Sequence, residues 1–369
     1  MKHQSSRICL YIHRVGLLTV VLFCASLSPV YSCEMNKSIA EDPAVFGRHL
    51  SGSCTSEDRQ RLAITTEEIF QAFQEGRRVD LSGVTIVGDL MFDQLPVASY
   101  QPIIEISPAA QRILSKRNIQ RGRIVQGALS IKDSVVLGSW ATNLRNEVLM
   151  FVGDVHITGT TFQQSIDFSQ VVFLKTVNFS HSTIIYESFF IRSHFEEEAL
   201  FEGVSFGTHS RFHKAQFKKG VSFFESQFTG VAEFLEVSFE QLANFRKTQF
   251  AMGAGFSGAI FHGPAIFEEA NFTREIYFRF TNFHENVNFQ DAMFQEASDF
   301  MNAEFSDDRN FGNAKFQVAP NFSGTVLENI WKGDNTNKQV SERLAIALAS
   351  LGALCFLIWG IRKWRQSYL

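Results

Sequence analysis

The feature that most constrains this chain is a large apolar residue that recurs at alternating intervals of five and six residues. The series runs from Phe162 to Leu327, and every position in it is phenylalanine except Ile184 and Leu327. The repeating unit is therefore eleven residues. The chain holds 39 phenylalanines against 6 tyrosines and 4 tryptophans, a bias that indicates one structural position repeated many times.

Neither a regular helix nor a straight strand satisfies this spacing. In a helix, five or six residues place successive rings about 130° apart, so the rings form no common seam. In a strand, the side-chain period of two sends residue i+5 to the opposite face. The spacing instead predicts a chain that turns a corner after each phenylalanine, so that every ring points inward from a new side.

The residues that precede each ring support this interpretation. The position two before the ring is small, often alanine, as at Ala199, Ala243 and Ala265, and the position between is mostly polar. Because i−2 and i share one face of an extended segment, small and large side chains both point inward while i−1 points outward.

The consensus F-x-x-A-x-F-x-x-x-A-x, seen in FSGAIFHGPAIF from Phe256 and FEEANF from Phe267, resembles the pentapeptide-repeat family. The resemblance implies an all-β solenoid, a right-handed quadrilateral β-helix in which two repeat units make one four-sided coil. Some cytoplasmic relatives imitate the charge of duplex DNA and bind topoisomerases.

Residues upstream of the array predict a cap and two interruptions. ITTEEIFQAFQEG predicts a short capping helix over 66–76, since a threonine precedes two glutamates and a one-sided apolar pattern. The repeat phase begins at Leu81, is lost over 93–123, returns at Leu129, and is lost again over 138–148. Insertions in a solenoid map to corner loops, which often contact partners. The first insertion carries a basic candidate partner surface: Arg112, Lys116, Arg117, Arg121 and Arg123. A solvated helix packed on the solenoid is the alternative.

The two ends of the chain predict export and a membrane anchor. Residues 1–32 have the order of a secretory signal, with basic residues, a short apolar core and a small-residue cleavage site. The 18 apolar residues 344–361 precede basic residues and rise about 27 Å as a helix, which suffices to span a bilayer. An uncleaved N-terminal anchor and a C-terminal helix packed on the soluble domain stay open as alternatives.

Two of the five cysteines fall in the expected mature exported part. Cys33 and Cys54 can pair in an oxidising compartment. Lipid modification of Cys33 is the alternative, although the bulky Tyr31 is unfavourable for that signal.

No motif for a nucleophile, nucleotide, dinucleotide or zinc-helix site occurs, so we expect no catalytic residue, cofactor or metal. His262 and His284 lie one coil apart, but two surface imidazoles without a third ligand usually bind no metal. Between 162 and 330 the chain has 21 Asp and Glu against 12 Lys and Arg, a net charge of −9. An exported chain does not meet chromosomal enzymes, so we expect no nucleic-acid partner, and DNA mimicry is kept only as an alternative.

These observations divide the chain into seven expected parts: signal peptide 1–32, linker 33–65, capping helix and irregular coils 66–161, β-helix 162–330, linker 331–343, transmembrane helix 344–361 and cytoplasmic tail 362–369. We expect a non-enzymatic scaffold or spacer in a bacterial cell membrane, with a single span, its main domain extracytoplasmic and an unknown protein partner. DNA mimicry and a carbohydrate-active β-helix enzyme are the alternative functions.

Overall fold

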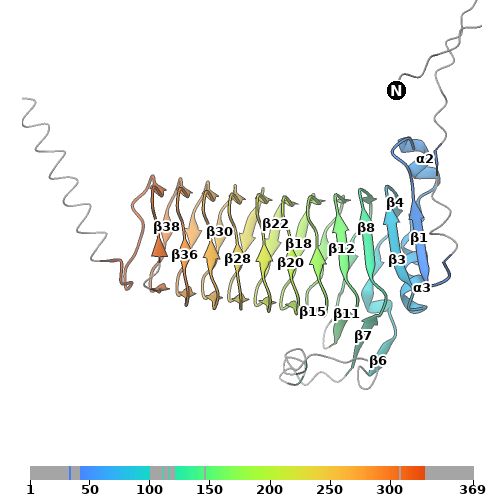
Figure 1. The fold of residues 1–369 in the computed structure, drawn as a ribbon, viewed down its shortest axis with the longest axis horizontal. Coiled ribbons are helices and arrows are strands. Elements are labelled where there is room, and N and C mark those ends of the chain that lie inside the picture. The colour runs from blue at the N-terminus through green and yellow to red at the C-terminus, as the bar shows by residue number, and fades with distance from the viewer. Residues whose placement is uncertain are drawn as a thin grey trace, which may run out of the picture. The chain divides into compact units, whose positions relative to one another are not determined.

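The fold is a four-sided β-helix in a computed structural model that describes residues 33–34, 42–99, 111, 115, 121–144, 147–306 and 309–328. Each coil contributes one short strand to each of four sheets in turn, and the coils stack from β1 to β38 as Figure 1 shows. Strand pairing between the described coils is parallel throughout, except for the β6 and β7 pair. The expected all-β solenoid is confirmed.

Sheet 1 has 11 strands: β1 (Val45–His49), β3 (Arg78–Ser82), β8 (Leu129–Lys132), β12 (Val155–Thr158), β16 (Val177–Asn178), β20 (Ala199–Leu200), β24 (Val221–Ser222), β28 (Ala243–Asn244), β32 (Ala265–Ile266), β36 (Val287–Asn288) and β40 (Arg309–Asn310). Sheet 2 also has 11: β2 (Ile64–Thr65), β4 (Thr85–Val87), β9 (Val135–Val136), β13 (Thr161–Phe162), β17 (Thr183–Ile184), β21 (Ser205–Phe206), β25 (Gln227–Phe228), β29 (Gln249–Phe250), β33 (Asn271–Phe272), β37 (Met293–Phe294) and β41 (Lys315–Phe316).

Sheet 3 has 9 strands: β5 (Leu90–Met91), β10 (Trp140–Ala141), β14 (Ile166–Asp167), β18 (Glu187–Phe189), β22 (His209–Arg211), β26 (Val231–Glu233), β30 (Ala254–Gly255), β34 (Ile276–Tyr277) and β38 (Ser298–Asp299). Sheet 4 has 10: β6 (Val97–Ser99), β7 (Arg121–Val125), β11 (Val148–Phe151), β15 (Val171–Phe173), β19 (His194–Phe195), β23 (Gln216–Phe217), β27 (Ser238–Phe239), β31 (Ile260–Phe261), β35 (Asn282–Phe283) and β39 (Glu304–Phe305).

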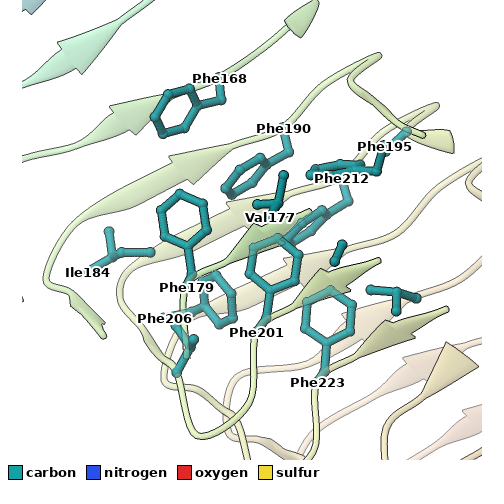
Figure 2. Packing of buried hydrophobic residues seen from close by; sticks show 14 of the residues in the cluster. Phe168, Val177, Phe179, Ile184, Phe190, Phe195, Phe201, Phe206, Phe212 and Phe223 are labelled. Atoms are coloured by element: carbon teal, nitrogen blue, oxygen red, sulfur yellow. The ribbon is translucent and has the colours of Figure 1, made fainter. Parts of the chain in front are cut away.

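The phenylalanines fill the interior as four columns of stacked rings. Rings one coil apart lie nearly parallel, as with Phe206 and Phe228, whose centroids are 4.5 Å apart at an interplanar angle of 2°. Rings of the opposite columns of sheets 1 and 3 meet edge to face, as with Phe245 and Phe256 at 5.2 Å and 88°. Figure 2 shows part of this packing, with Phe201 beside Phe223. Burying each ring contributes roughly 1.5 to 3 kcal/mol, so these columns are the main source of stability.

A turn at every second corner explains the alternation of five and six. After the ring residues of sheets 1 and 3, the chain turns within five residues, and the second residue after the ring has positive φ. This φ recurs every eleven residues at Gln170, His181, Arg192, Gly203, Lys214, Glu225, Glu236, Lys247, Gly258, Glu269, Phe280, Asp291, Asn302, Asn313 and Gly324. The ring carbonyl accepts a hydrogen bond from the N–H three residues later, as from Ser182 to Phe179 at 3.1 Å. This is the pattern of a type II turn.

Outward asparagines and aspartates close these same turns. The side chain of Asn178 accepts a hydrogen bond from the N–H of Ser180 at 2.8 Å, and Asn244 and Arg246 repeat the contact at 3.0 Å. Such side chains replace a missing backbone partner and favour the turn. The outward asparagines of sheets 1 and 3 are therefore structural.

Helix α3 (Thr66–Gln74) covers one end of the core. Thr65 caps it in a reciprocal pair with Glu68, and its buried residues Ile69, Ala72 and Phe73 join the core, with Phe73 6.2 Å from Phe92. In the first coil, α3 takes the place of the strands that sheets 3 and 4 have in later coils. The helix therefore shields the first strands of these two sheets. Helix α2 (Ser56–Arg61) lies between β1 and β2, and a 3₁₀ turn follows β5 at Phe92–Gln94.

The expectation of a linker over 33–65 was wrong, because β1 and β2 in this segment already belong to the first coil. The repeat phase was also expected to be lost over 138–148, but the structure keeps it at the beginning of this range. Trp140 is fully buried and pairs with Leu90 and Ile166. It occupies the usually small i−2 position, and the ring position two residues later is Thr142, so large and small have exchanged places.

Both insertions lie at one corner, between sheets 3 and 4. Val79 pairs with Leu129 across the first insertion, so these two residues are separated by far more chain than one regular coil contains. Trp140 pairs with Ile166 across the second insertion, which adds four residues to a regular coil. β6 within the first insertion pairs antiparallel with β7. None of the helices in the described ranges is long and apolar enough to cross a membrane. The expected signal 1–32, linker 331–343, span 344–361 and tail 362–369 lie outside these ranges.

Candidate interaction surface

The basic partner surface expected from the sequence is only partly described. Arg112, Lys116 and Arg117 lie outside the described residues. Arg121 is exposed at the start of β7. The Arg123 side chain is only 14% exposed, forms an ion pair with Glu147 at 2.8 Å and donates to the carbonyl of Leu95. Arg123 thus fastens the insertion to the solenoid, and its charge is largely neutralised there.

Cys33 and Cys54 are joined to each other. A disulfide connects Cys33 to Cys54 across 21 residues, next to the start of α2. Cys54 is buried at the edge of the core, and Cys33 packs against it. The bond therefore ties the first described residues to the capped end of the β-helix.

The histidine pair considered for a metal does come together. Nδ1 of His262 and Nδ1 of His284 are 3.0 Å apart on an exposed corner after sheet 4. Because both atoms are ring nitrogens, one imidazole must donate a proton to the other. Within the described residues no group of three or more His, Cys, Asp or Glu side chains is placed to hold a metal ion.

A buried histidine lies on the outer side of sheet 4. His194 is 1% exposed and its Nε2 lies 2.7 Å from Glu196. Burial lowers the pKa of His194, and the hydrogen bond to Glu196 opposes this shift without cancelling it. The next outward residues along the sheet, Val172 and Met150, are buried and apolar, so this part of sheet 4 does not face open solvent.

The exposed apolar residues gather on sheet 3. Seven of the eleven large apolar side chains that stand exposed in the described ranges lie on this sheet or at its corners: Ile185, Tyr186, Val231, Met252, Tyr277, Phe280 and Val318. Four of these, Val231, Met252, Tyr277 and Phe280, come from adjacent coils, and we name them the apolar strip. Such a concentration marks an interaction site more often than scattered exposed residues do.

A notch of about 430 Å³ opens in the middle of this strip. Its floor is formed by Gly255 of β30, which stands in the outward column of sheet 3 between Glu233 and Tyr277. Glycine has no side chain, so a gap one coil high remains between these two larger residues. Leu235 and Met252 line the sides.

Charged groups flank the notch on both sides. Towards β22, Glu233 accepts a hydrogen bond from Arg211 at 2.9 Å and lies 3.2 Å from His209. Towards β38, Arg279 forms an ion pair with Asp299 at 2.5 Å and stacks on the ring of Tyr277 at 5.2 Å. The notch is thus an apolar depression with fixed, mutually neutralised charges at its rims.

Sequence reasoning overlooked this surface although the signal was present. Gly255 and Tyr277 directly precede the ring residues Phe256 and Phe278, so the repeat phase already places them outward. A missing or aromatic side chain at a normally polar position was the available sign. To predict that the exposed apolar residues cluster on one face, one must know both the register between coils and the positions of the corners.

Comparison with known families supports the repeat. A model described as pentapeptide repeats (9 copies) matches residues 223–271. The expected pentapeptide repeat is confirmed there. The matched residues include β30, which carries the floor of the notch, and the same register continues on both sides of the match. No curated protein and no solved structure matches the chain.

Proposed function

We propose that the protein is a non-enzymatic interaction scaffold or rigid spacer, tethered to a bacterial cell membrane with its β-helix on the extracytoplasmic side. The observation that carries the interaction role is the apolar strip and its notch on sheet 3. A stack of stiff, hydrogen-bonded coils holds such a surface at fixed spacing, as repeat proteins commonly do.

The membrane part of the proposal is supported by the sequence ends. The signal-like residues 1–32, the 18 apolar residues 344–361 and the basic residues behind them fit an exported chain with one C-terminal span. The Cys33 to Cys54 disulfide is in keeping with an oxidising compartment. Alkaline extraction of membranes tests the span, because a peripheral protein is released and a spanning one is retained.

The enzyme alternative has less support. Glu233 and Glu275 both line the notch, which is where a glycosidase would place its carboxylates. Glu233, however, is paired with Arg211 and His209, so it is held as a structural anion. DNA mimicry would require a cytoplasmic address, and topoisomerase inhibition by the full chain would favour it over our proposal.

Photo-crosslinking in intact membranes tests the interaction role. A photoreactive residue replaces Met252 in the full chain, and Met293 on sheet 2 serves as the matched control because the two residues are 56% and 39% exposed. We expect protein adducts from position 252 and few from position 293. Absence of adducts at 252, or equal adducts at both positions, would contradict the proposal.

A deletion variant tests the basic insertion separately. Removing 93–123 would destroy most of β7, which pairs with β11, so the deletion should be confined to 100–119 and bridged by a Gly-Ser linker. Loss of a crosslinked partner with retained folding would assign part of the binding to this segment. Unchanged adducts would show that sheet 3 binds alone.

A further inference from the structure

We infer that His262 and His284 form a chelating site for a divalent transition metal that prefers square-planar or tetragonal geometry, Cu²⁺ above all. This inference goes beyond the proposed scaffold role and does not depend on it. Nδ1 of the two imidazoles lie 3.0 Å apart, and the ring centroids are 4.7 Å apart at an interplanar angle of 62°. Neutral imidazole is a good ligand for copper, nickel and zinc, so two such nitrogens facing each other can share one ion.

The backbone holds both histidines side by side before a metal binds. His262 follows β31 and His284 follows β35, two strands that pair in register through Phe261 and Phe283. The N–H of His262 donates to the carbonyl of Phe239 at 2.8 Å, and the N–H of His284 donates to the carbonyl of Phe261 at 2.9 Å. Binding therefore has to order only two side chains, and such preorganisation favours affinity.

The separation of the two nitrogens indicates which metal geometry fits. Two nitrogens that each lie about 2.1 Å from one metal are about 3.0 Å apart when the angle at the metal is about 90°, and about 3.4 Å apart at a tetrahedral angle of about 109°. The observed 3.0 Å matches adjacent ligands of a square-planar or tetragonal site. Cu²⁺ and Ni²⁺ prefer this geometry, and Cu²⁺ binds such ligands more tightly than the other divalent first-row metals do.

Metal binding requires a change of tautomer in one ring. Before a metal binds, one Nδ1–H donates to the other Nδ1, whereas coordination uses the lone pairs of both Nδ1 atoms. The proton of the donor ring therefore moves through water to Nε2 of the same ring, so both imidazoles stay neutral and no net proton is released. His284 is exposed and His262 is partly exposed, so water reaches the pair. The broad χ2 torsion of histidine lets both rings turn towards a common ion.

The adjacent coil contributes charge to the site. Glu240 stands one coil before His262, because Phe239 pairs with Phe261 in register. Its carboxylate accepts a hydrogen bond from Lys218 at 3.1 Å, so it is already engaged. Among the residues that the structure describes, no third protein ligand joins the pair, and water would fill the remaining positions on the metal. No metal was expected from the sequence for want of this third ligand, and the 3.0 Å separation is the observation that changes the expectation.

Titration of the purified full-length protein with Cu²⁺ tests the site. Isothermal calorimetry measures the affinity, and electron paramagnetic resonance reports how many imidazole nitrogens bind the metal. We expect one Cu²⁺ held by two imidazoles, and His262→Gln and His284→Gln should each weaken this binding at least about tenfold, since losing even an outer-shell partner costs about 10-fold to 100-fold. The double variant should bind no more weakly than either single variant, because a chelate is already lost with its first ligand.

The matched control is His156→Gln. His156 is an exposed histidine on β12, and its described neighbours in register, Ser130 and Asn178, carry no imidazole. This variant should bind Cu²⁺ as the parent does, and equal melting temperatures of all variants without added metal verify folding. Losses that add up in the double variant, or an equal loss in His156→Gln, would show that single imidazoles bind separately and would overturn the inference. Unchanged binding in both single variants would also overturn it.

Discussion

Removing one ring from the middle of the array should cost far more than removing one at its end. Phe245 is fully buried, stacks on Phe223 at 5.0 Å and on Phe267 at 4.9 Å, and meets three further rings, Phe234, Phe239 and Phe256, edge to face. Replacing it by alanine removes the burial of a whole ring and leaves a cavity in a rigid interior. Such a change costs about 3 to 5 kcal/mol, and the loss of two stacked and three edge-to-face partners places Phe245→Ala at about 5 kcal/mol.

The matched variant is Phe311→Ala near the last described coil. Phe311 is only partly buried, and within the described ranges it stacks on Phe289 alone, at 4.9 Å. We expect a loss of about 2 kcal/mol, since one neighbouring coil is affected and part of the ring is already in water. Urea unfolding followed by circular dichroism measures both free energies. Equal losses, or a loss below about 1 kcal/mol for Phe245→Ala, would refute the idea that stacked rings hold the coils together.

Three further perturbations test separate parts of the structure. Gly258→Ala should destabilise the fold by about 1 kcal/mol because φ at this turn is +70°, whereas Gly255→Ala, outside the positive-φ region, should change the unfolding midpoint little. Because burial lowers the pKa of His194, the unfolded chain takes up a proton below about pH 6.5 more readily than the folded chain, so the free energy of unfolding should fall as the pH drops below that value. His194→Gln should flatten this pH dependence, and an unchanged pH profile would contradict the role given to His194. Cys54→Ser should lower the free energy of unfolding by about 3 kcal/mol through the loss of the 21-residue crosslink, and a melting temperature equal to that of the parent would argue against a structural role.

The sequence predicted the solenoid because its repeat is local and nearly uninterrupted. Each eleven-residue unit specifies two sides and two corners, so the inward ladder from Phe162 onward follows from spacing alone. The capping helix was predictable for the same reason, since Thr65, Glu68 and Ile69 lie within one turn of each other. The rest of the first coil was not, because β1 and β2 show no phenylalanine period and are fixed by pairing with β3 and β4.

Positions where size rather than polarity changed were harder to interpret. Trp140 and Thr142 exchange the large and small roles, which hides the phase although the backbone register is kept. The candidate surface was hidden for a different reason. Gly255, Tyr277 and Met252 are three different residue types in different repeat units, so no single repeat unit reveals the surface. Only the stacking of coils shows that the gap at Gly255, the ring of Tyr277 and the apolar corner at Met252 adjoin.

The central claim is that two repeat units advance the chain by one strand spacing, and distances between spin labels measure this directly. Ser205, Met293 and Lys315 lie in one outward column of sheet 2, which the register of successive strands connects. Labels at Ser205 and Met293 should be separated by about 19 Å, and labels at Ser205 and Lys315 by about 24 Å, one step of about 4.8 Å for the additional coil. An increase of about 33 Å between Met293 and Lys315, as in an α-helix, or broad distributions without a defined step, would contradict the account.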